Sequence, residues 1–175
     1  GYAIPGAVLA VGVMVTLGAV DNGIDSLMRQ SFGFSTGLLF SGTIAAVTFG
    51  YLVRFLALAF GSVEASLAKV TPSMDGAARS LGQGALGTLK RVHLPMIRGS
   101  LLTAVMLVFV DGMKELPMTI SLRPFNFHTL ATYVHQFASD EQLGDASLAA
   151  LAIVAFGILP VIGLSLAITR SRPGH

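Results

Sequence analysis

Residues 148–169 read LAALAIVAFGILPVIGLSLAIT, and no charged side chain interrupts this stretch. A helix rises 1.5 Å per residue, so about 20 mainly apolar residues cross the roughly 30 Å hydrocarbon core of a bilayer. The stretch meets that length, and only Pro160 breaks its run of helix-compatible residues. It therefore predicts a transmembrane helix, and it makes a membrane the expected environment of the chain.

Three more stretches pass the same test. Residues 2–20 carry no charge, residues 38–60 contain only Arg54, and residues 97–113 have Asp111 near their end. Backbone groups in lipid must be satisfied within the chain, and runs of this length favour helices over the short strands of a barrel. We expect one all-α domain over residues 1–175, a polytopic bundle of about four transmembrane spans. Small residues in the first two spans predict close packing between these helices. They are Gly6, Ala7, Ala10, Gly12, Gly18, Gly42, Ala45, Ala46 and Gly50.

The composition agrees with a membrane protein. Hydrophobic residues make up 53% of the chain and charged residues 11%, whereas soluble domains carry about 25% charged residues. The absence of Cys excludes disulfides and thiolate metal sites, and a net charge of +2 gives no indication of nucleic acid. The chain opens without Met or a charged signal region and ends on a polar tail. We therefore expect it to be the C-terminal part of a longer polypeptide.

Lys and Arg residues in short loops predict the orientation of the spans. Residues 61–98 and the C-terminal tail are basic, whereas the other connections carry most of the acidic residues. This predicts that the 61–98 loop and the C-terminus are cytoplasmic, and that Gly1 starts on the same side. The basic residues of the loop and the tail are Lys69, Arg79, Lys90, Arg91, Arg98, Arg170 and Arg172. The other connections carry the basic residues Arg29, Lys114 and Arg123 and the acidic residues Asp21, Asp25, Glu115, Asp140, Glu141 and Asp145.

The cytoplasmic loop over residues 72–95 is too polar to span a membrane and too regular to be a linker. Its apolar or small residues recur every three or four positions, which predicts one amphipathic helix or two short helices in line. Thr71-Pro72-Ser73 is a typical helix start, a break is expected near Gly82, and Pro95 is expected to end the amphipathic part. The spacing fits a helix resting on the inner leaflet and a helix docking into a soluble partner equally well. The residues on this face are Met74, Ala78, Leu81, Ala85, Leu89 and Val92.

Within this loop, Gly76-Ala77-Ala78-Arg79-Ser80-Leu81-Gly82, followed after nine residues by Val92-His93-Leu94-Pro95, resembles the EAA motif of ABC importer permeases. Gly76 stands where the family has Glu, and Asp75 lies one position earlier. The resemblance implies coupling helices that seat in a separate ATPase subunit. The residues assigned to that docking are Asp75, Gly76, Ala77, Ala78, Arg79, Gly82, Leu94 and Pro95.

The resemblance extends along essentially the whole chain. Tyr2-Ala3-Ile4-Pro5-Gly6, Tyr51-Leu52-Val53-Arg54-Phe55, Lys114-Glu115-Leu116-Pro117 and Leu122-Arg123-Pro124-Phe125-Asn126-Phe127 are similar to segments of ferric-iron importer permeases. This implies an inner-membrane translocation subunit that is not itself an enzyme. It also implies three partners: an ATPase subunit that binds ATP and Mg, a periplasmic binding protein, and another permease half or a second copy. Permeases for thiamine, polyamines and other small solutes share much of this pattern.

Charged residues at membrane depth supply the candidate site in the spans. Asp111 and Glu115 are four residues apart, which predicts one helical face at the outer end of the third span, with Lys114 beside them. They are interpreted either as a structural ion pair near the headgroups or as part of an outer gate or pathway. Arg54 is expected to reach toward the cytoplasmic interface or to bind a helix end.

The outer segment over residues 117–144 is expected to contain a short interfacial helix over 128–139. His128 and His135 within it invite a metal hypothesis, but ferric iron favours hard oxygen ligands, and we predict neither a metal site nor a resident cofactor in this chain.

Two other classes of protein remain as alternatives to an ABC permease. A secondary transporter would use an ion gradient without any ATPase, and it would usually show internal repeats or a broken helix. Pro160 is weak support for a broken helix, and no clear repeat is visible in the sequence. An intramembrane enzyme would need paired catalytic groups within the spans, and Asp111 has no second aspartate at a comparable depth. We therefore expect no catalytic residues, and the chain has no P-loop motif of its own.

Overall fold

The computed structural model describes the backbone of residues 3–171 and the side chains of that range except at positions 164 and 167–171. This part of the chain contains helices and no strand, which confirms the all-α prediction. The predicted orientation of the spans used Gly1, Arg170 and Arg172. Gly1 and the side chains of Arg170 and Arg172 lie outside the described part of the chain. The elements in chain order are α1 (Gly6–Phe32), α2 (Ile44–Leu67), α3 (Pro72–Ser80), α4 (Ala85–Thr88), the π-helical turn η1 (Leu89–His93), α5 (Leu94–Met113), α6 (Pro117–Leu122), α7 (Leu130–Ser139) and α8 (Leu143–Ser171).

Four helical stretches of the described chain are long and apolar enough to cross a membrane, as predicted: Gly6–Phe32, Ile44–Leu67, Ala85–Met113 and Leu143–Gly163. Their ends differ from the predicted ones, because a helix stops at a backbone signal and not where the apolar run stops. The first helix continues past Val20 to Phe32 and ends at Gly33, whose φ of 74° places it in the left-handed region that terminates helices. The second helix begins only after Thr43, whose side chain accepts a hydrogen bond from the Ala45 N–H.

The third span differs most from the prediction. Pro95 was expected to end the amphipathic part of the loop, but the chain is helical without interruption from Ala85 to Met113. A proline ring inside an α-helix clashes with the carbonyl four residues earlier and removes one hydrogen bond. Here the wider π-helical turn η1 immediately precedes Leu94 and Pro95. We attribute the uninterrupted helix to this turn, which relaxes the backbone where the ring enters.

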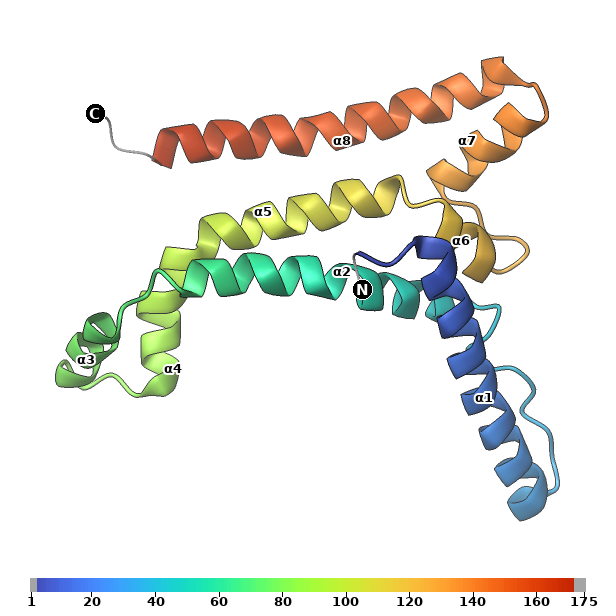
Figure 1. Cartoon of the computed structure of the whole chain (residues 1–175), viewed down its shortest axis with the longest axis horizontal. Coiled ribbons are helices and arrows are strands. Elements are labelled where there is room, and N and C mark those ends of the chain that lie inside the picture. The colour runs from blue at the N-terminus through green and yellow to red at the C-terminus, as the bar shows by residue number, and fades with distance from the viewer. Residues whose placement is uncertain (1–2, 172–175) are drawn as a thin grey trace.

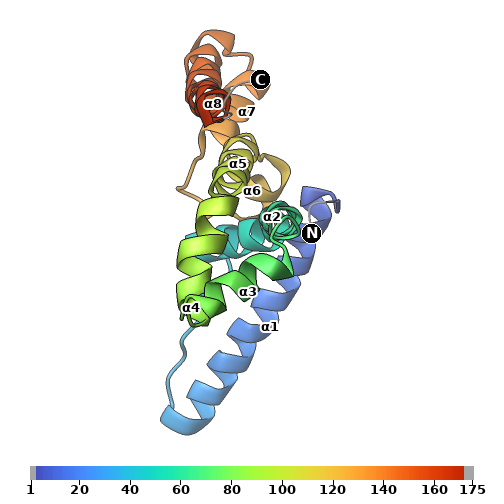
Figure 2. The same cartoon turned by 90° about the vertical axis from the view of Figure 1, so that its left-hand side faces the viewer.

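The long helices form two groups. Figure 1 shows α2, α5 and α8 running along a common direction, with α3 and α4 at one end and α6 and α7 at the other. Helix α1 leaves this group at a steep angle, and Figure 2, in which the other three helices are seen nearly end-on, shows the same inclination. Helix α1 therefore packs mainly against α6 and α2, at the end of the bundle where α6 lies.

The buried core lies where α1, α2 and α6 meet. It consists of Ala10, Val13, Ala46, Val47, Met118 and Leu122. Small residues permit this contact, because a Cβ at Gly50 would lie only 2.7 Å from Leu122 Cδ1. The predicted close packing through small side chains is thus observed at this junction.

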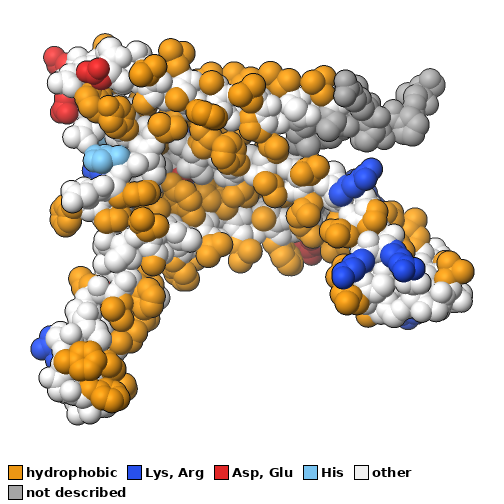
Figure 3. Space-filling view, turned by 180° about the vertical axis from the view of Figure 1, so that it is seen from behind, with side chains coloured by type: hydrophobic (Ala, Val, Ile, Leu, Met, Phe, Trp, Pro, Cys, Tyr) orange, Lys and Arg blue, Asp and Glu red, His pale blue; other side chains and the backbone are white. Residues whose placement is uncertain are grey.

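The surface separates by charge. Figure 3 shows hydrophobic side chains over most of the long helices, Lys and Arg gathered on the lobe formed by α3 and α4, and Asp and Glu at the corner between α7 and α8. Such a distribution is typical of a protein whose waist lies in lipid and whose two ends face water.

Candidate functional site

The loop over residues 72–95 folds into a compact lobe. Helix α3 begins at Pro72, as the Thr71-Pro72-Ser73 signal predicts, and Asp75 lies in its first turn, near the positive end of the helix dipole. The chain breaks at Gly82, whose φ is 76°, so the predicted break is confirmed and requires a residue that tolerates the left-handed region.

The second half of the loop turns back instead of continuing in line. Figures 1 and 2 both show α4 beside α3, joined by a tight loop. His93 Nε2 lies 2.7 Å from Asp75 Oδ1, and this contact connects η1 to the first turn of α3. The expectation of one helix or two helices in line is therefore wrong, because the left-handed Gly82 reverses the chain and the Asp75–His93 contact holds the reversed arm.

The reversal divides the predicted apolar face. Ala78 is buried inside the lobe, whereas Leu81 has 79% of its surface exposed. Met74, Leu86 and Leu89 are exposed with it, and the exposed Lys90 and Arg91 flank them. The lobe thus presents apolar side chains with basic residues at their edge, and Ala77, Arg79, Leu94 and Pro95 of the predicted motif are also exposed.

A charged pocket lies in the bundle at the C-terminal end of α5. It encloses about 270 Å³ and is lined by Arg54, Phe55, Asp111, Lys114 and Glu115. Arg54 Nε lies 3.0 Å from Glu115 Oε2, and Lys114 Nζ lies 2.8 Å from Asp111 Oδ1. The three predicted pathway residues are thus brought together, and both interpretations persist, because the same residues form ion pairs and line a cavity.

The reason that these residues meet differs from the prediction. Helix α5 ends at Met113, so Glu115 lies beyond it and does not share a helical face with Asp111. The turn before Pro117 instead directs Glu115 inward, where its side chain is 8% exposed and opposes Arg54 in the middle of α2.

The structure brings Arg54 into the pocket beside the three predicted residues. Arg54 was expected to reach toward the cytoplasmic interface or to bind a helix end, and it contacts the segment that leads into α1. Its guanidinium pairs with Glu115 and donates a hydrogen bond from Nη1 to the Ile4 carbonyl, 3.2 Å away. Gly6 packs against this ion pair, because a Cβ at its position would lie 2.5 Å from Glu115 Oε1. A side chain at position 6 would require the Glu115 carboxylate to move.

The segment over residues 117–144 contains a short helix as predicted, α7 over Leu130–Ser139, with a reciprocal capping box between Thr129 and Thr132. Its position at the membrane interface stays a prediction. His128 Nδ1 lies 3.1 Å from Arg123 Nη1, next to a cation and not among ligands. Within the part of the chain that the structure describes, no group of three or more His, Cys, Asp or Glu side chains could hold a metal ion.

Comparison with known proteins tests the resemblance itself. No protein-family model matches the chain. It is 28% identical over 160 residues to the Fe(3+)-transport system permease protein FbpB 2 of Haemophilus influenzae, an alignment covering 91% of this chain and 28% of that protein. It is 26% identical over 132 residues to PhnV of Salmonella paratyphi A, the permease protein of a provisionally assigned 2-aminoethylphosphonate transport system, covering 75% of this chain and 50% of that protein.

A third relative, provisionally named as the ferric transport system permease protein FbpB 1 of Haemophilus influenzae, is 23% identical over 84% of this chain. The chain spans half or less of the length of these relatives. The similarity nonetheless covers most of the chain, and the four apolar helices agree with it. The chain is therefore a multi-pass membrane protein and a homologue of ABC importer permeases.

Proposed function

We propose that the chain is the membrane-spanning permease part of an ATP-driven importer of the inner membrane, with ferric iron as its solute. The observation that carries this proposal is the similarity over 91% of the chain to a permease protein named for Fe(3+) transport. In this proposal a periplasmic binding protein delivers the solute, another permease half or a second copy completes the pathway, and the 61–98 loop faces the cytoplasm. ATP and Mg bind to a separate ATPase subunit.

The lobe over residues 72–95 is the proposed docking surface for that ATPase subunit. Its exposed Leu81, Leu86 and Leu89 provide apolar contact area, and Lys90 and Arg91 add positive charge at the edge. Exposed apolar side chains rimmed by polar residues are typical of protein interfaces. The basic edge also suits an inner-leaflet surface, so a resting position on lipid is the competing role for this lobe.

The pocket lined by Arg54, Asp111, Lys114 and Glu115 is the proposed contribution of this chain to the solute pathway. Charged groups within a span usually face a cavity or one another, and here they do both. Because the pocket carries both cationic and anionic groups, it does not distinguish ferric iron from a phosphonate. The similarity to PhnV makes 2-aminoethylphosphonate the second candidate solute, ahead of thiamine or a polyamine.

The test uses the complete transporter in lipid vesicles with its ATPase subunit and a panel of loaded binding proteins. ATP hydrolysis stimulated by a ferric-loaded binding protein supports iron, and stimulation by a phosphonate-loaded one replaces iron while keeping the class. Glu115→Gln is expected to slow uptake while leaving binding of the ATPase subunit unchanged. Solute uptake driven by an ion gradient without any ATPase subunit would overturn the proposal in favour of a secondary transporter.

The docking surface is tested by direct binding of the ATPase subunit. Leu81→Asp places a charge at a residue with 79% of its surface exposed, so it is expected to remove most of the binding without unfolding the protein. Phe125→Asp is the matched control, because Phe125 is fully exposed on the opposite connection and should leave binding unchanged. Equal binding by both variants would assign the lobe to the lipid surface instead.

A further inference from the structure

The connection between α1 and α2, residues 33–43, combines an irregular backbone with an apolar surface. It contains no charged residue, and Phe34, Leu38, Leu39 and Phe40 are all exposed. The Phe34 ring also lies 6.3 Å from that of Phe32, the last residue of α1. A water-facing loop has no need of such side chains, which points to an apolar environment around this connection.

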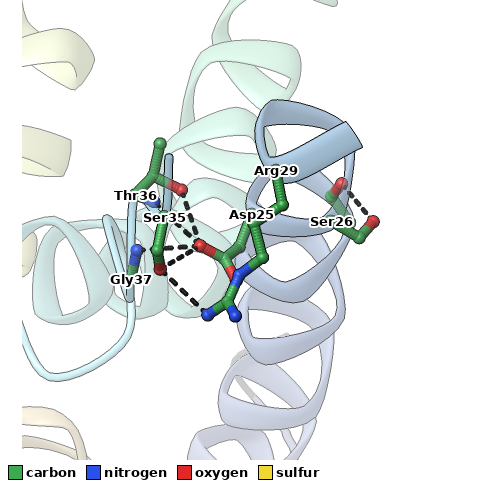
Figure 4. Close-up of polar contacts among 7 residues, drawn as sticks. Asp25, Ser26, Arg29, Ser35, Thr36 and Gly37 are labelled. Atoms are coloured by element: carbon green, nitrogen blue, oxygen red, sulfur yellow. Dashed lines mark hydrogen bonds and ion pairs between the residues drawn. The ribbon is translucent and has the colours of Figure 1, made fainter. Parts of the chain in front are cut away.

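Two aspartates one helical turn apart hold the backbone of this connection. Asp25 Oδ1 accepts hydrogen bonds from the Thr36 N–H at 2.8 Å and the Gly37 N–H at 3.1 Å, and from the Ser35 hydroxyl at 2.6 Å. Figure 4 shows these groups converging on Asp25 from the loop, with Arg29 on the same face of α1. Ser26 points away from the cluster, toward the other side of the helix.

Asp21 performs the same task for the next part of the loop. Its side chain has no exposed surface, and it accepts hydrogen bonds from the N–H groups of Leu39, Phe40 and Ser41 at 3.1, 3.0 and 2.8 Å. The Thr43 N–H then bonds the Phe40 carbonyl at 3.2 Å. Most of the backbone N–H groups of this irregular segment are therefore bonded to groups of the chain itself, and five of them are bonded to the two aspartates.

Irregular backbone is excluded from the hydrocarbon core, and near it each N–H that is bonded within the chain lowers the cost of lost water. The apolar surface of the loop also continues that of α1, a helix able to span a membrane whose Val15 and Leu27 are exposed. Arg29 stands at the edge of this surface, bonded to Asp25 and Ser35, where a guanidinium can meet headgroup phosphates.

We propose that residues 33–43 lie in the lipid interface, with the Phe34 and Leu38 side chains among the acyl chains, and that Asp21 and Asp25 favour this position by accepting hydrogen bonds from five of the loop's backbone N–H groups. The occupant of this surface is phospholipid, and neither a soluble protein nor bulk water. The proposal concerns the chain in a bilayer and does not depend on the proposed solute or on ATP hydrolysis.

Depth measurement by spin labelling tests this directly, and the absence of native Cys makes single labels unambiguous. Phe34→Cys and Leu38→Cys are labelled in the full chain reconstituted in phosphatidylcholine–phosphatidylglycerol vesicles. Collisions with oxygen, which concentrates in lipid, are compared with collisions with a water-soluble nickel chelate. Leu151→Cys on the exposed surface of α8 is the lipid control, and Asp140→Cys at the turn after α7 is the water control.

Oxygen-to-nickel ratios at positions 34 and 38 that match position 151 and exceed position 140 are the expected result. Ratios that match position 140 would place the loop in water and overturn the proposal, and labels shielded from both reagents would replace lipid with a second copy of the chain. Asp25→Ala, added to each label, is expected to shift the ratio toward the water control. Asp145→Ala, at an exposed acid of α8, should leave it unchanged.

Discussion

Residues 33–43 precede α2 and residues 68–93 follow it, and the two connections differ in charge, in helix content and in what holds them. The first has no charged residue and no helix, and its backbone is bonded to Asp21 and Asp25 of the preceding helix. The second carries several charged residues, satisfies its backbone by forming α3, α4 and η1, and is closed by a single side-chain contact between Asp75 and His93.

The two connections therefore differ in how much their backbone hydrogen bonds depend on residues of other elements. A helical connection satisfies its own hydrogen bonds locally, so removing one side-chain contact leaves most of them intact. An irregular connection depends on acceptors supplied by another element, and losing one carboxylate leaves several donors without a partner. The three predictions below use this contrast, in order of decreasing effect.

Asp21→Ala is expected to have the largest effect, with loss of most of the folded, monodisperse protein in detergent. It would leave three N–H groups at a fully buried position without an acceptor, which is among the more damaging changes a protein can undergo. Size-exclusion chromatography and thermal unfolding followed by circular dichroism measure it. Asp145→Ala provides the control, and a profile for Asp21→Ala equal to that of the control would show that the loop does not need its carboxylates.

Glycine substitutions should have opposite signs in the two connections. Gly37 has a φ of 64°, so Gly37→Ala is expected to cost about 1–2 kcal/mol of local stability. Gly76 lies within α3 with open space around a Cβ position, so Gly76→Ala should stabilise that helix by about 0.5–1 kcal/mol.

Hydrogen exchange of peptides covering 33–43 and 72–82 measures both effects in one experiment. Faster exchange is expected in the first peptide of Gly37→Ala and slower exchange in the second peptide of Gly76→Ala. Changes of the same sign in both would contradict the contrast between the connections.

Removing the Asp75–His93 contact should have the smallest effect. Both side chains are partly exposed, and a hydrogen bond of this kind contributes about 1 kcal/mol. Asp75→Ala and His93→Ala are each expected to speed hydrogen exchange in α3 modestly. The double variant should be no worse than either single one, because both lose the same contact, and fully additive effects would argue that the contact is not formed.

The helical class and the four long helices could be predicted from the sequence because they depend on local properties. An apolar run such as 148–169 has one favourable state in lipid, and Thr71-Pro72-Ser73 starts a helix whatever surrounds it. The break at Gly82 and the short helix over Leu130–Ser139 were predicted for the same reason. The docking residues of the 72–95 loop remain a prediction from resemblance.

Predictions failed where distant segments meet. Glu115 was placed on the face of α5, but the helix ends two residues earlier and the side chain turns toward Arg54, 61 positions away in sequence. Nothing in the spacing of Asp21 and Asp25 indicated that they bind a loop, because their partners are backbone N–H groups, which every residue except proline possesses.

The sequence by itself determined that the chain is an all-α membrane protein, because hydrophobic length and helix signals are properties of consecutive residues, and its resemblance to permeases agrees with the similarity found over most of the chain. The tertiary structure alone decided that Arg54 joins the charged pocket, that α4 folds back on α3, and that two aspartates of α1 hold the loop before α2. These features depend on the angles at which the helices meet. Those angles are set by packing contacts between helices, such as Gly50 against Leu122. Such contacts join residues that are far apart in the sequence, so no single segment encodes them.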